Sequence, residues 1–169
     1  MRTHTVTDSP LGPLTLVAED EALAGLYMTG QRHRPPEETF GERDPSRPVF
    51  GRVAEELEAY FTGELTEFGI PLALHGTPFQ RRVWEQLRGI PYGCVISYGQ
   101  LAERLGQPGA SRAVGLANGR NPVGIVVPCH RVVGSTGSLT GYGGGLERKR
   151  HLLDFERGLR EPRGLASHM

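Results

Sequence analysis

The sequence predicts a two-domain protein of the α/β (α+β) class. A small N-terminal α/β domain with a β-sheet is expected over residues 1–76, and a mainly helical domain over residues 77–160. Short β-branched runs dominate the first part, whereas helix-start signals and helical periodicity dominate the second. Charge divides at the same place, since the first part carries six basic and 13 acidic residues and the second carries 12 basic and five acidic. A basic half is a candidate surface for a polyanion, although attraction between the two halves is an alternative explanation.

The N-terminal domain is expected to contain short strands, one helix and a long loop. Turn-forming residues in SPLGP separate the first two strands. Apolar residues recur at helical spacing from Phe50 to Phe61, and Gly63 suits the end of that helix. The expected strands are residues 4–7, 14–19, 22–28 and 70–74, and the polar, proline-rich loop is residues 31–48. No catalytic constellation is visible in this domain.

Two capping boxes mark helix starts in the C-terminal domain. Thr77 is followed three residues later by Gln80, and Ser97 by Gln100, so each helix is expected to begin with mutual side-chain and backbone hydrogen bonds. An apolar stripe follows each box, and a further helix is expected from Leu146 to about residue 157.

The second capping box begins a helix-turn-helix pattern of winged-helix-like character. A glycine-containing turn over residues 106–109 separates two short helices. The second helix carries Arg112 and places small residues on its inner face, at Ala110, Ala113, Val114 and Ala117. This pattern favours close approach to a nucleic-acid groove, although such helix pairs are also common in proteins that never touch DNA.

Composition excludes several classes of protein. No stretch is long and apolar enough to cross a bilayer, and the N-terminus lacks the apolar core of a signal peptide. Two cysteines form neither a disulfide framework nor the paired spacing of a zinc site. We therefore expect a cytoplasmic protein without metal, cofactor or membrane association. Residues 161–169 are expected to form a tail, whose final GLASHM resembles added tag sequence.

The segment VVPCHRVVG places Cys129 beside His130, which indicates nucleophilic chemistry. A thiolate is a strong nucleophile, and a neighbouring base makes it available at neutral pH. The run GIVVP before Cys129 is expected to be extended. Adjacent residues of an extended segment point in opposite directions, so a contact between Cys129 and His130 needs a tight turn or an intervening water. A third group usually orients such a histidine, and Glu156 is the candidate because it shares a helix face with the apolar Leu152.

Each of these residues has a simpler interpretation. Cys129 could be a small buried hydrophobe, as Cys94 is expected to be, and Glu156 could be an ordinary surface residue near a helix end. The glycine-rich segment GSTGSLTGYGGG lacks the GK[ST] ending of a phosphate loop, so a flexible wall or lid is the better interpretation. Tyr142 within it is either a pocket residue or a plain loop aromatic.

The segment IVVPCHRVVGSTGSLTGYGGG closely resembles the active-site region of the O6-alkylguanine-DNA alkyltransferases, also called methylated-DNA–protein-cysteine methyltransferases. TPFQRRVWEQLRGIPYGCVISYGQLA, SRAVGLANGRNP and LLDFE match the family pattern in the same order. The resemblance is strong over residues 77–156 and looser at DSPLGPLTL and AYFTGEL. It implies single-turnover DNA repair, in which a flipped base transfers its alkyl group irreversibly to the protein's own cysteine.

The resemblance also implies roles for individual residues. Cys129 would accept the alkyl group, His130 would act as its base through a water, and Glu156 would orient His130. Tyr98 would help protonate the leaving guanine, and Asn121 would brace the active-site turn. The implied DNA-contacting residues are Tyr98, Ser111, Arg112, Ala113, Gly115, Asn118 and Arg131, with Arg112 filling the place of the flipped nucleotide. The implied pocket residues are Val132, Tyr142, Gly143 and Gly144.

The implied partner is double-stranded DNA that carries O6-alkylguanine, with O4-alkylthymine as a further substrate. The protein would be a monomer in solution, and cooperative binding along DNA stays open. Some family members hold zinc in the N-terminal part, but no cysteine is present there, so no zinc is expected. Gly143 stands where many relatives have serine. The hydroxyl contact to the base would be missing, and backbone groups alone would recognise the base there.

Three other functions fit parts of the pattern. A lesion-binding protein of the same fold would lack the acceptor cysteine, which this chain retains. A regulator that senses alkylation would need an additional metal-binding domain with several cysteines. A thiol hydrolase with a Cys-His-Glu triad would turn over repeatedly on an ester or amide, whereas an alkyltransferase reacts once.

Overall fold

The N-terminal part of the structure is an antiparallel sheet with one parallel edge strand. The structure is a computed structural model that describes residues 1–158; the expected tail at 161–169 lies outside the described residues. The sheet order is β3-β2-β1-β4, and β4 pairs parallel to β1. The strands are β1 (Arg2–Thr7), β2 (Leu14–Glu19), β3 (Ala22–Met28) and β4 (Glu42–Arg43).

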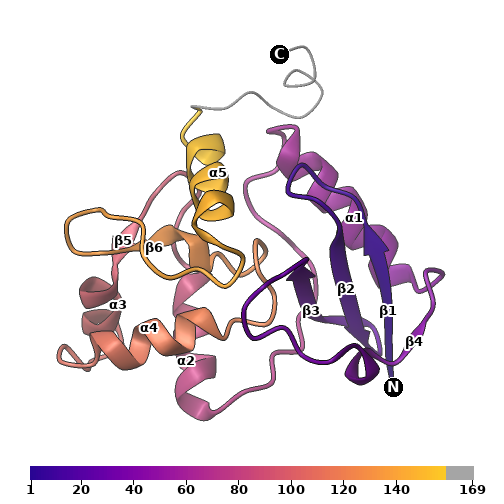
Figure 1. Ribbon diagram of the computed structural model, residues 1–169, viewed down its shortest axis with the longest axis horizontal. Helices are drawn as coiled ribbons and strands as arrows, with labels where there is room; N and C mark the ends of the chain where they lie inside the picture. Colours follow the sequence, from indigo (N-terminus) through magenta and orange to yellow (C-terminus); the bar gives the residue numbers. More distant parts are fainter. Residues whose placement is uncertain (159–169) are drawn as a thin grey trace.

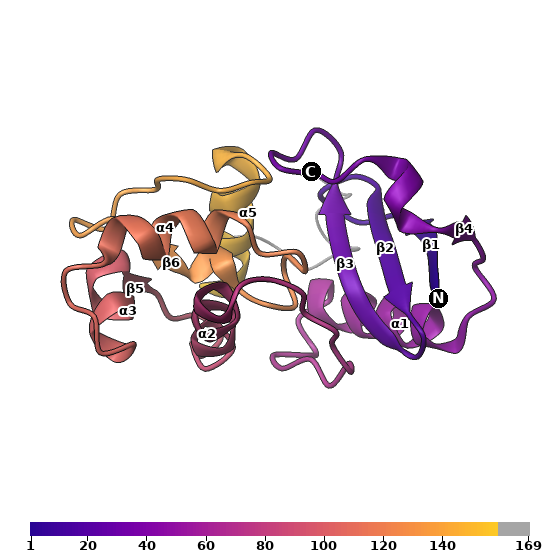
Figure 2. The same cartoon turned by 90° about the horizontal axis from the view of Figure 1, so that it is seen from below.

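The helix α1 (Pro48–Phe61) packs against this sheet, and both lie to one side of the helical part (Figures 1 and 2). Its buried side chains recur every three or four residues, as the periodicity predicts, and Gly63 follows with a φ of 85°. Gly63 suits this conformation because it lacks a Cβ. Buried residues of the sheet, of α1 and of the helical part form one continuous hydrophobic cluster.

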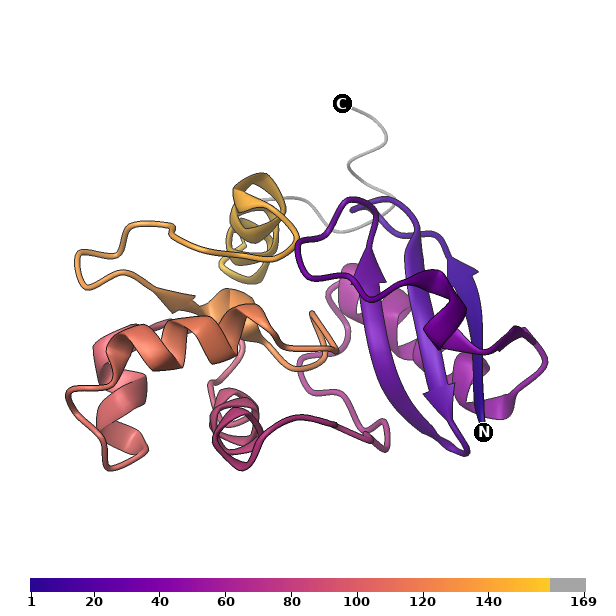
Figure 3. The ribbon, with the colours of Figure 1, turned by 60° about the horizontal axis from the view of Figure 1, so that its bottom comes forward.

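The C-terminal part is mainly helical, and both predicted capping boxes are present. Its elements are α2 (Pro78–Leu87), β5 (Ile96–Ser97), α3 (Tyr98–Arg104), α4 (Ser111–Gly119), η2 (Cys129–Arg131), β6 (Val132–Val133) and α5 (Leu146–Glu156). The strands β5 and β6 form a small parallel pair. Helices α3 and α4 pack together at the end away from the larger sheet (Figure 3). The predicted α/β (α+β) fold with a helix-turn-helix is confirmed.

Several local expectations were wrong. Residues 70–74 contribute only an isolated bridge between Leu72 and Leu23 instead of a strand. The loop after β3 contains a 3-10 helix, η1 (Glu37–Phe40), and the strand β4. Ala113, expected on the inner face of α4, is exposed, because the Val114 and Ala117 side chains already fill the contact with the rest of the domain.

Direct backbone contacts hold the two parts together. The amide of Leu26 in β3 donates to the carbonyl of Pro122 at 2.8 Å, and the amide of Arg32 donates to the carbonyl of Gly143 at 2.7 Å. The strand β3 and the loop that follows it therefore contact the segments before and after η2, and they can fix the positions of both. Within residues 1–158, no helix has the length and apolar character that crossing a membrane requires.

Candidate active site

Cys129 lies in a tight turn. The segment before it was expected to be extended, but Ile125 has a φ of 70°, and the amide of Val127 donates to the carbonyl of Val123 at 2.9 Å. The residues of η2 then form one turn of 3-10 helix. Successive side chains in such a helix project about 120° apart instead of to opposite sides. The side chains of Cys129 and His130 therefore do not point to opposite sides of the chain, as they would in an extended segment.

Two buried asparagines hold this turn. The Nδ2 of Asn121 donates to the carbonyl of Val127 at 2.8 Å, and its Oδ1 accepts from the amide of Val123 at 3.0 Å. Asn118 donates from Nδ2 to the carbonyl of Cys129 at 3.3 Å. Asn118 was expected on the DNA-contacting surface, but it is 2% exposed, because its amide faces the interior of the turn.

His130 and Glu156 form a buried pair. The imidazole is fully buried, and its Nε2 lies 2.8 Å from Oε2 of Glu156. Because an ionised carboxylate only accepts hydrogen bonds, Nε2 carries the hydrogen and Nδ1 carries the free lone pair. Nδ1 is buried and has no hydrogen-bond partner among the described residues. Burial lowers the pKa of His130, which keeps the ring neutral and ready to accept a proton.

Arg131 lies in the interior and binds Glu156, although it was expected to contact DNA. Its Nε donates to Oε1 of Glu156 at 2.8 Å, its Nη2 donates to Oε2 at 2.9 Å, and its Nη1 donates to the carbonyl of Ile90 at 2.7 Å. This bidentate ion pair leaves little of the guanidinium for DNA. Burial alone would raise the pKa of Glu156, but His130 and Arg131 together hold it well below its usual range.

A further donor to Glu156 comes from the N-terminal part of the chain. The hydroxyl of Tyr60 in α1 donates to Oε2 of Glu156 at 2.5 Å. Tyr60 is fully buried. Nothing in the sequence marks Tyr60 as part of the site, because a tyrosine within an amphipathic helix gives no separate signal.

The Cys129 thiol has a buried cation nearby. Burial raises the pKa of Cys129, while hydrogen bonding by Asn121 and the positive charge of Lys149 act in the opposite direction. Lys149 is itself fully buried, and burial lowers its pKa to about 8. The resting side chain is therefore a thiol, which must lose its proton before it can attack. Lys149 was not among the predicted site residues either, although it is the only lysine in an arginine-rich chain.

The glycine-rich segment 134–145 forms a wall beside Tyr98. The hydroxyl of Tyr98 donates to the carbonyl of Thr140 at 2.9 Å. Gly143 is tied to Arg32 of the N-terminal part, and a Cβ at Gly144 would lie 2.6 Å from the sulfur of Met28. Tyr142 is half-buried and packs against the main hydrophobic cluster, and burial raises the pKa of its hydroxyl well above the usual value. Val132, also expected in the pocket, is fully buried in β6.

The exposed face of α4 has the character of a nucleic-acid contact surface. Ser111, Arg112 and Ala113 are exposed, and so is the apolar Leu116, at 70%. Gly115 lies on the side of Tyr98, where an added Cβ would sit 3.8 Å from the ring. Small side chains let a helix approach a groove closely, and Arg112 projects from the same surface.

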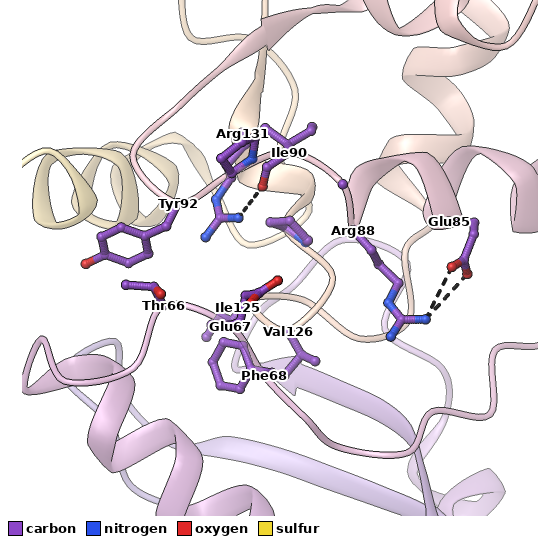
Figure 4. A pocket seen from close by; sticks show the side chains of 13 residues that line it. Thr66, Glu67, Phe68, Glu85, Arg88, Ile90, Tyr92, Ile125, Val126 and Arg131 are labelled. Carbon is purple, nitrogen blue, oxygen red and sulfur yellow. Dashed lines mark hydrogen bonds and ion pairs between the residues drawn. The ribbon is translucent and has the colours of Figure 1, made fainter.

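A cleft of about 820 Å³ opens behind the active-site turn. Pro128 and Arg131 line it, together with Tyr92 and Phe68, but Cys129 does not (Figure 4). The guanidinium of Arg131 lies 5.7 Å from the centre of the Tyr92 ring. The cleft therefore belongs to the rear of the site. Among the described residues, no three His, Cys, Asp or Glu side chains gather as metal ligands.

Comparison with known proteins gives one consistent result. Residues 78–158 match the 6-O-methylguanine DNA methyltransferase DNA binding domain, and residues 3–74 match the ribonuclease-like domain of the same family. A methylated-DNA–protein-cysteine methyltransferase of Mycolicibacterium paratuberculosis is 54% identical over 91% of this chain and 92% of its own. One from Methanosarcina acetivorans is 45% identical over 90% and 97%. A crystal structure of Mycobacterium tuberculosis OGT in complex with DNA superimposes with a TM-score of 0.88 at 50% identity, covering 99% of both chains.

Proposed function

The chain belongs to the O6-alkylguanine-DNA alkyltransferase family, and we propose that Cys129 is the residue on which it accepts the alkyl group. The activity is direct reversal of DNA alkylation damage by transfer to a protein cysteine. The observation that carries the assignment is the unpartnered Nδ1 of His130. It is a buried base with a free lone pair, on the residue next to the thiol.

The first step is loss of the thiol proton. His130 accepts the proton of Cys129 at Nδ1, through a water that bridges the two side chains. The imidazolium that forms is stabilised by the carboxylate of Glu156, which accepts from Nε2. Lys149 favours the thiolate electrostatically.

The second step is a displacement at the alkyl carbon. A bond forms between that carbon and the sulfur of Cys129, while the bond between the carbon and O6 of guanine breaks. The electron pair of the broken bond stays on the guanine, which takes up a proton that Tyr98 donates. The product is a thioether, and no group in the site regenerates the thiol, so each molecule reacts once.

The target atom must leave the base stack before it can reach Cys129. We propose that α4 enters a groove of double-stranded DNA with its small exposed residues, and that Arg112 occupies the space of the flipped nucleotide. O4-alkylthymine is a second substrate in this proposal, because its alkyl oxygen has a similar position on the base. Neither metal nor cofactor has a part in the two steps.

Two finer points belong to the same proposal. The protein acts as a monomer in solution, which size-exclusion chromatography with light scattering tests. We also assign it to the cytoplasm, because a reducing compartment keeps the acceptor cysteine a thiol.

Mass spectrometry of the intact protein tests the proposed function. The protein is incubated with a duplex that carries one O6-methylguanine, and the product is digested and mapped. We expect one added methyl group on the peptide containing Cys129, with no further increase on excess DNA. Cys129→Ala should bind DNA and gain no mass. Methyl transfer by that variant, or repeated turnover by the wild type on an ester, would refute the assignment.

A further inference from the structure

We propose that Tyr60 is a positioning residue for alkyl transfer, which sets the proton affinity of His130 through the carboxylate of Glu156. This inference rests on the proposed function. Tyr60 and Glu156 are 96 positions apart in the chain, yet the phenol oxygen lies 2.5 Å from Oε2. The same Oε2 lies 2.8 Å from Nε2 of His130. The hydroxyl of Tyr60 and the base of the reaction therefore bind one oxygen atom.

The ring and the hydroxyl of Tyr60 have separate functions. The ring packs among aromatic residues, 5.0 Å between centroids from Phe61 and 5.6 Å from Phe155. A phenylalanine would fill that place equally well. The hydroxyl contributes only its bond to Glu156, so packing alone does not explain why the residue carries one.

Three donors converge on Oε2 of Glu156, which are the hydroxyl of Tyr60, Nε2 of His130 and Nη2 of Arg131. Each donor neutralises part of the carboxylate charge. The hydrogen bonds that the other two donors make to the same oxygen are therefore weaker. Without the hydroxyl, the carboxylate would bind the imidazolium form of His130 more strongly. The pKa of His130 would then rise, and the reaction would lose its base at a higher pH.

Other ionisable groups face this pair from the remaining elements. Arg131 in η2 and Lys149 in α5 act on His130, both disfavouring its protonated form. Tyr92 lies against Arg131 and contacts the ring of Tyr60, with 6.1 Å between the two ring centroids. None of these groups other than Arg131 hydrogen-bonds to Glu156 in the part of the chain that the structure describes. Tyr60 therefore differs from Tyr92 and Lys149 because its hydroxyl acts on the carboxylate of Glu156 through a direct hydrogen bond.

The bond also connects the two domains. Tyr60 lies in the segment that matches the ribonuclease-like domain, and Glu156 lies in the segment that matches the DNA binding domain. The N-terminal domain, which holds no nucleophile or base of the proposed reaction, thus supplies a side chain that acts on the base. Its contribution to repair would be chemical as well as structural.

The test compares Tyr60→Phe with Tyr92→Phe. Both variants lose one hydroxyl from the same aromatic cluster, and only the first loses a hydrogen bond to Glu156. Single-turnover methyl transfer is measured from pH 5 to pH 9 with a duplex carrying O6-methylguanine. For Tyr60→Phe we expect the acid limb of the profile to move to higher pH by about half a unit, with unchanged affinity for DNA. Tyr92→Phe should follow the wild type.

A second measurement needs no substrate. Nuclear magnetic resonance with labelled histidine should give a higher pKa for His130 in Tyr60→Phe than in the wild type or Tyr92→Phe. In wild-type protein with labelled tyrosine, the Tyr60 hydroxyl proton should resonate far downfield, as a short hydrogen bond requires. This measurement does not depend on the folding of any variant. In a Glu156→Gln background, Tyr60→Phe should cause no further shift of the acid limb.

The inference would be overturned by superimposable profiles, by equal shifts in the two tyrosine variants, or by a shift that persists in full without Glu156. Failure of the wild type to gain a methyl group at Cys129 is a different result. It would remove the proposed function, while the histidine titration would still report whether Tyr60 acts on His130.

Discussion

Lys149 and Tyr98 share one hydrogen-bond acceptor. The Nζ of Lys149 and the hydroxyl of Tyr98 donate to the carbonyl oxygen of Thr140 at 2.8 Å and 2.9 Å, and Nζ lies 5.8 Å from the centre of the Tyr98 ring. A fully buried ammonium group thus sits beside the phenol proposed to protonate the leaving base. Burial raises the pKa of Tyr98, so the phenol keeps its proton until it is needed.

Replacing Lys149 by methionine should slow methyl transfer. The side chain keeps its length but loses the charge that favours the thiolate of Cys129, so we expect a fall of about tenfold in the single-turnover rate. Rapid-quench kinetics at pH 7.5 measures it. Arg150→Met, which removes an exposed charge from the next position of α5, is the control and should keep the wild-type rate. An unchanged rate in Lys149→Met would contradict the electrostatic role.

The lowered pKa of Lys149 predicts that the stability of the fold depends on pH. The pKa of Lys149 is about 8 in the fold and 10.5 ordinarily. Between these values the unfolded chain holds more protons, so the contribution of Lys149 to stability rises as the pH increases from 8 to 10.5. Relative to Lys149→Met, the wild type should gain on the order of 1 kcal/mol in free energy of unfolding between pH 7.5 and 9.5. Urea unfolding of both proteins measures the difference, which would stay constant if the lysine were solvated.

Glu156→Gln should destabilise the protein and change its acid response. The substitution leaves the buried guanidinium of Arg131 without its counter-charge, which typically costs about 3–5 kcal/mol. Because the pKa of Glu156 is held below its usual 4.5, its stabilising contribution is present above that pH and is lost as the pH falls towards the folded value. Between pH 7 and pH 3, the free energy of unfolding should therefore fall less for the variant than for the wild type. Glu55→Gln, which changes an exposed residue of α1, is the control, and its free energy of unfolding should depend on pH as that of the wild type does.

Arg112→Ala should impair repair of duplex DNA more than reaction with free O6-alkylguanine. The side chain is exposed on α4, so its loss should leave the melting temperature unchanged while removing the group proposed to fill the base stack. Transfer rates with duplex and with free base are compared for Arg112→Ala and for Arg104→Ala, an exposed arginine of α3. Equal losses on both substrates would exclude the proposed role.

The fold was predictable where local signals were strong. The capping boxes at Thr77 and Ser97 fix helix starts through neighbouring residues alone, and both are present in the structure. The segment before Cys129 was mispredicted as extended because its β-branched residues favour strands. Two hydrogen bonds of the Asn121 side chain hold it as a turn instead, one donated to the carbonyl of Val127 and one accepted from the amide of Val123. Strand propensity takes no account of such local bonds between a side chain and the backbone.

The site was predictable only in part. The resemblance to a family gave Cys129, His130 and Glu156 their expected roles, and the structure brings the last two into contact. The partners of Glu156 were not predictable. Tyr60 reaches it across 96 positions, and Arg131, which the resemblance implied to be a DNA contact, binds it instead. Periodicity along a chain carries no information about which domain supplies a distant donor.

Alkylation of Cys129 should destabilise the protein. The side chain is 6% exposed and belongs to the main hydrophobic cluster, so an added methyl group must displace its neighbours. Overpacking of this kind costs about 1–3 kcal/mol, which corresponds to a fall in melting temperature of roughly 2–10 °C for a chain of this size. Differential scanning calorimetry after incubation with a methylated or an unmodified duplex measures it, with the DNA removed before the scan. Identical melting temperatures would mean that the pocket accommodates the methyl group without strain. A larger fall with an O6-benzylguanine duplex than with a methylated one would locate the strain at the acceptor sulfur, because only the size of the transferred group differs.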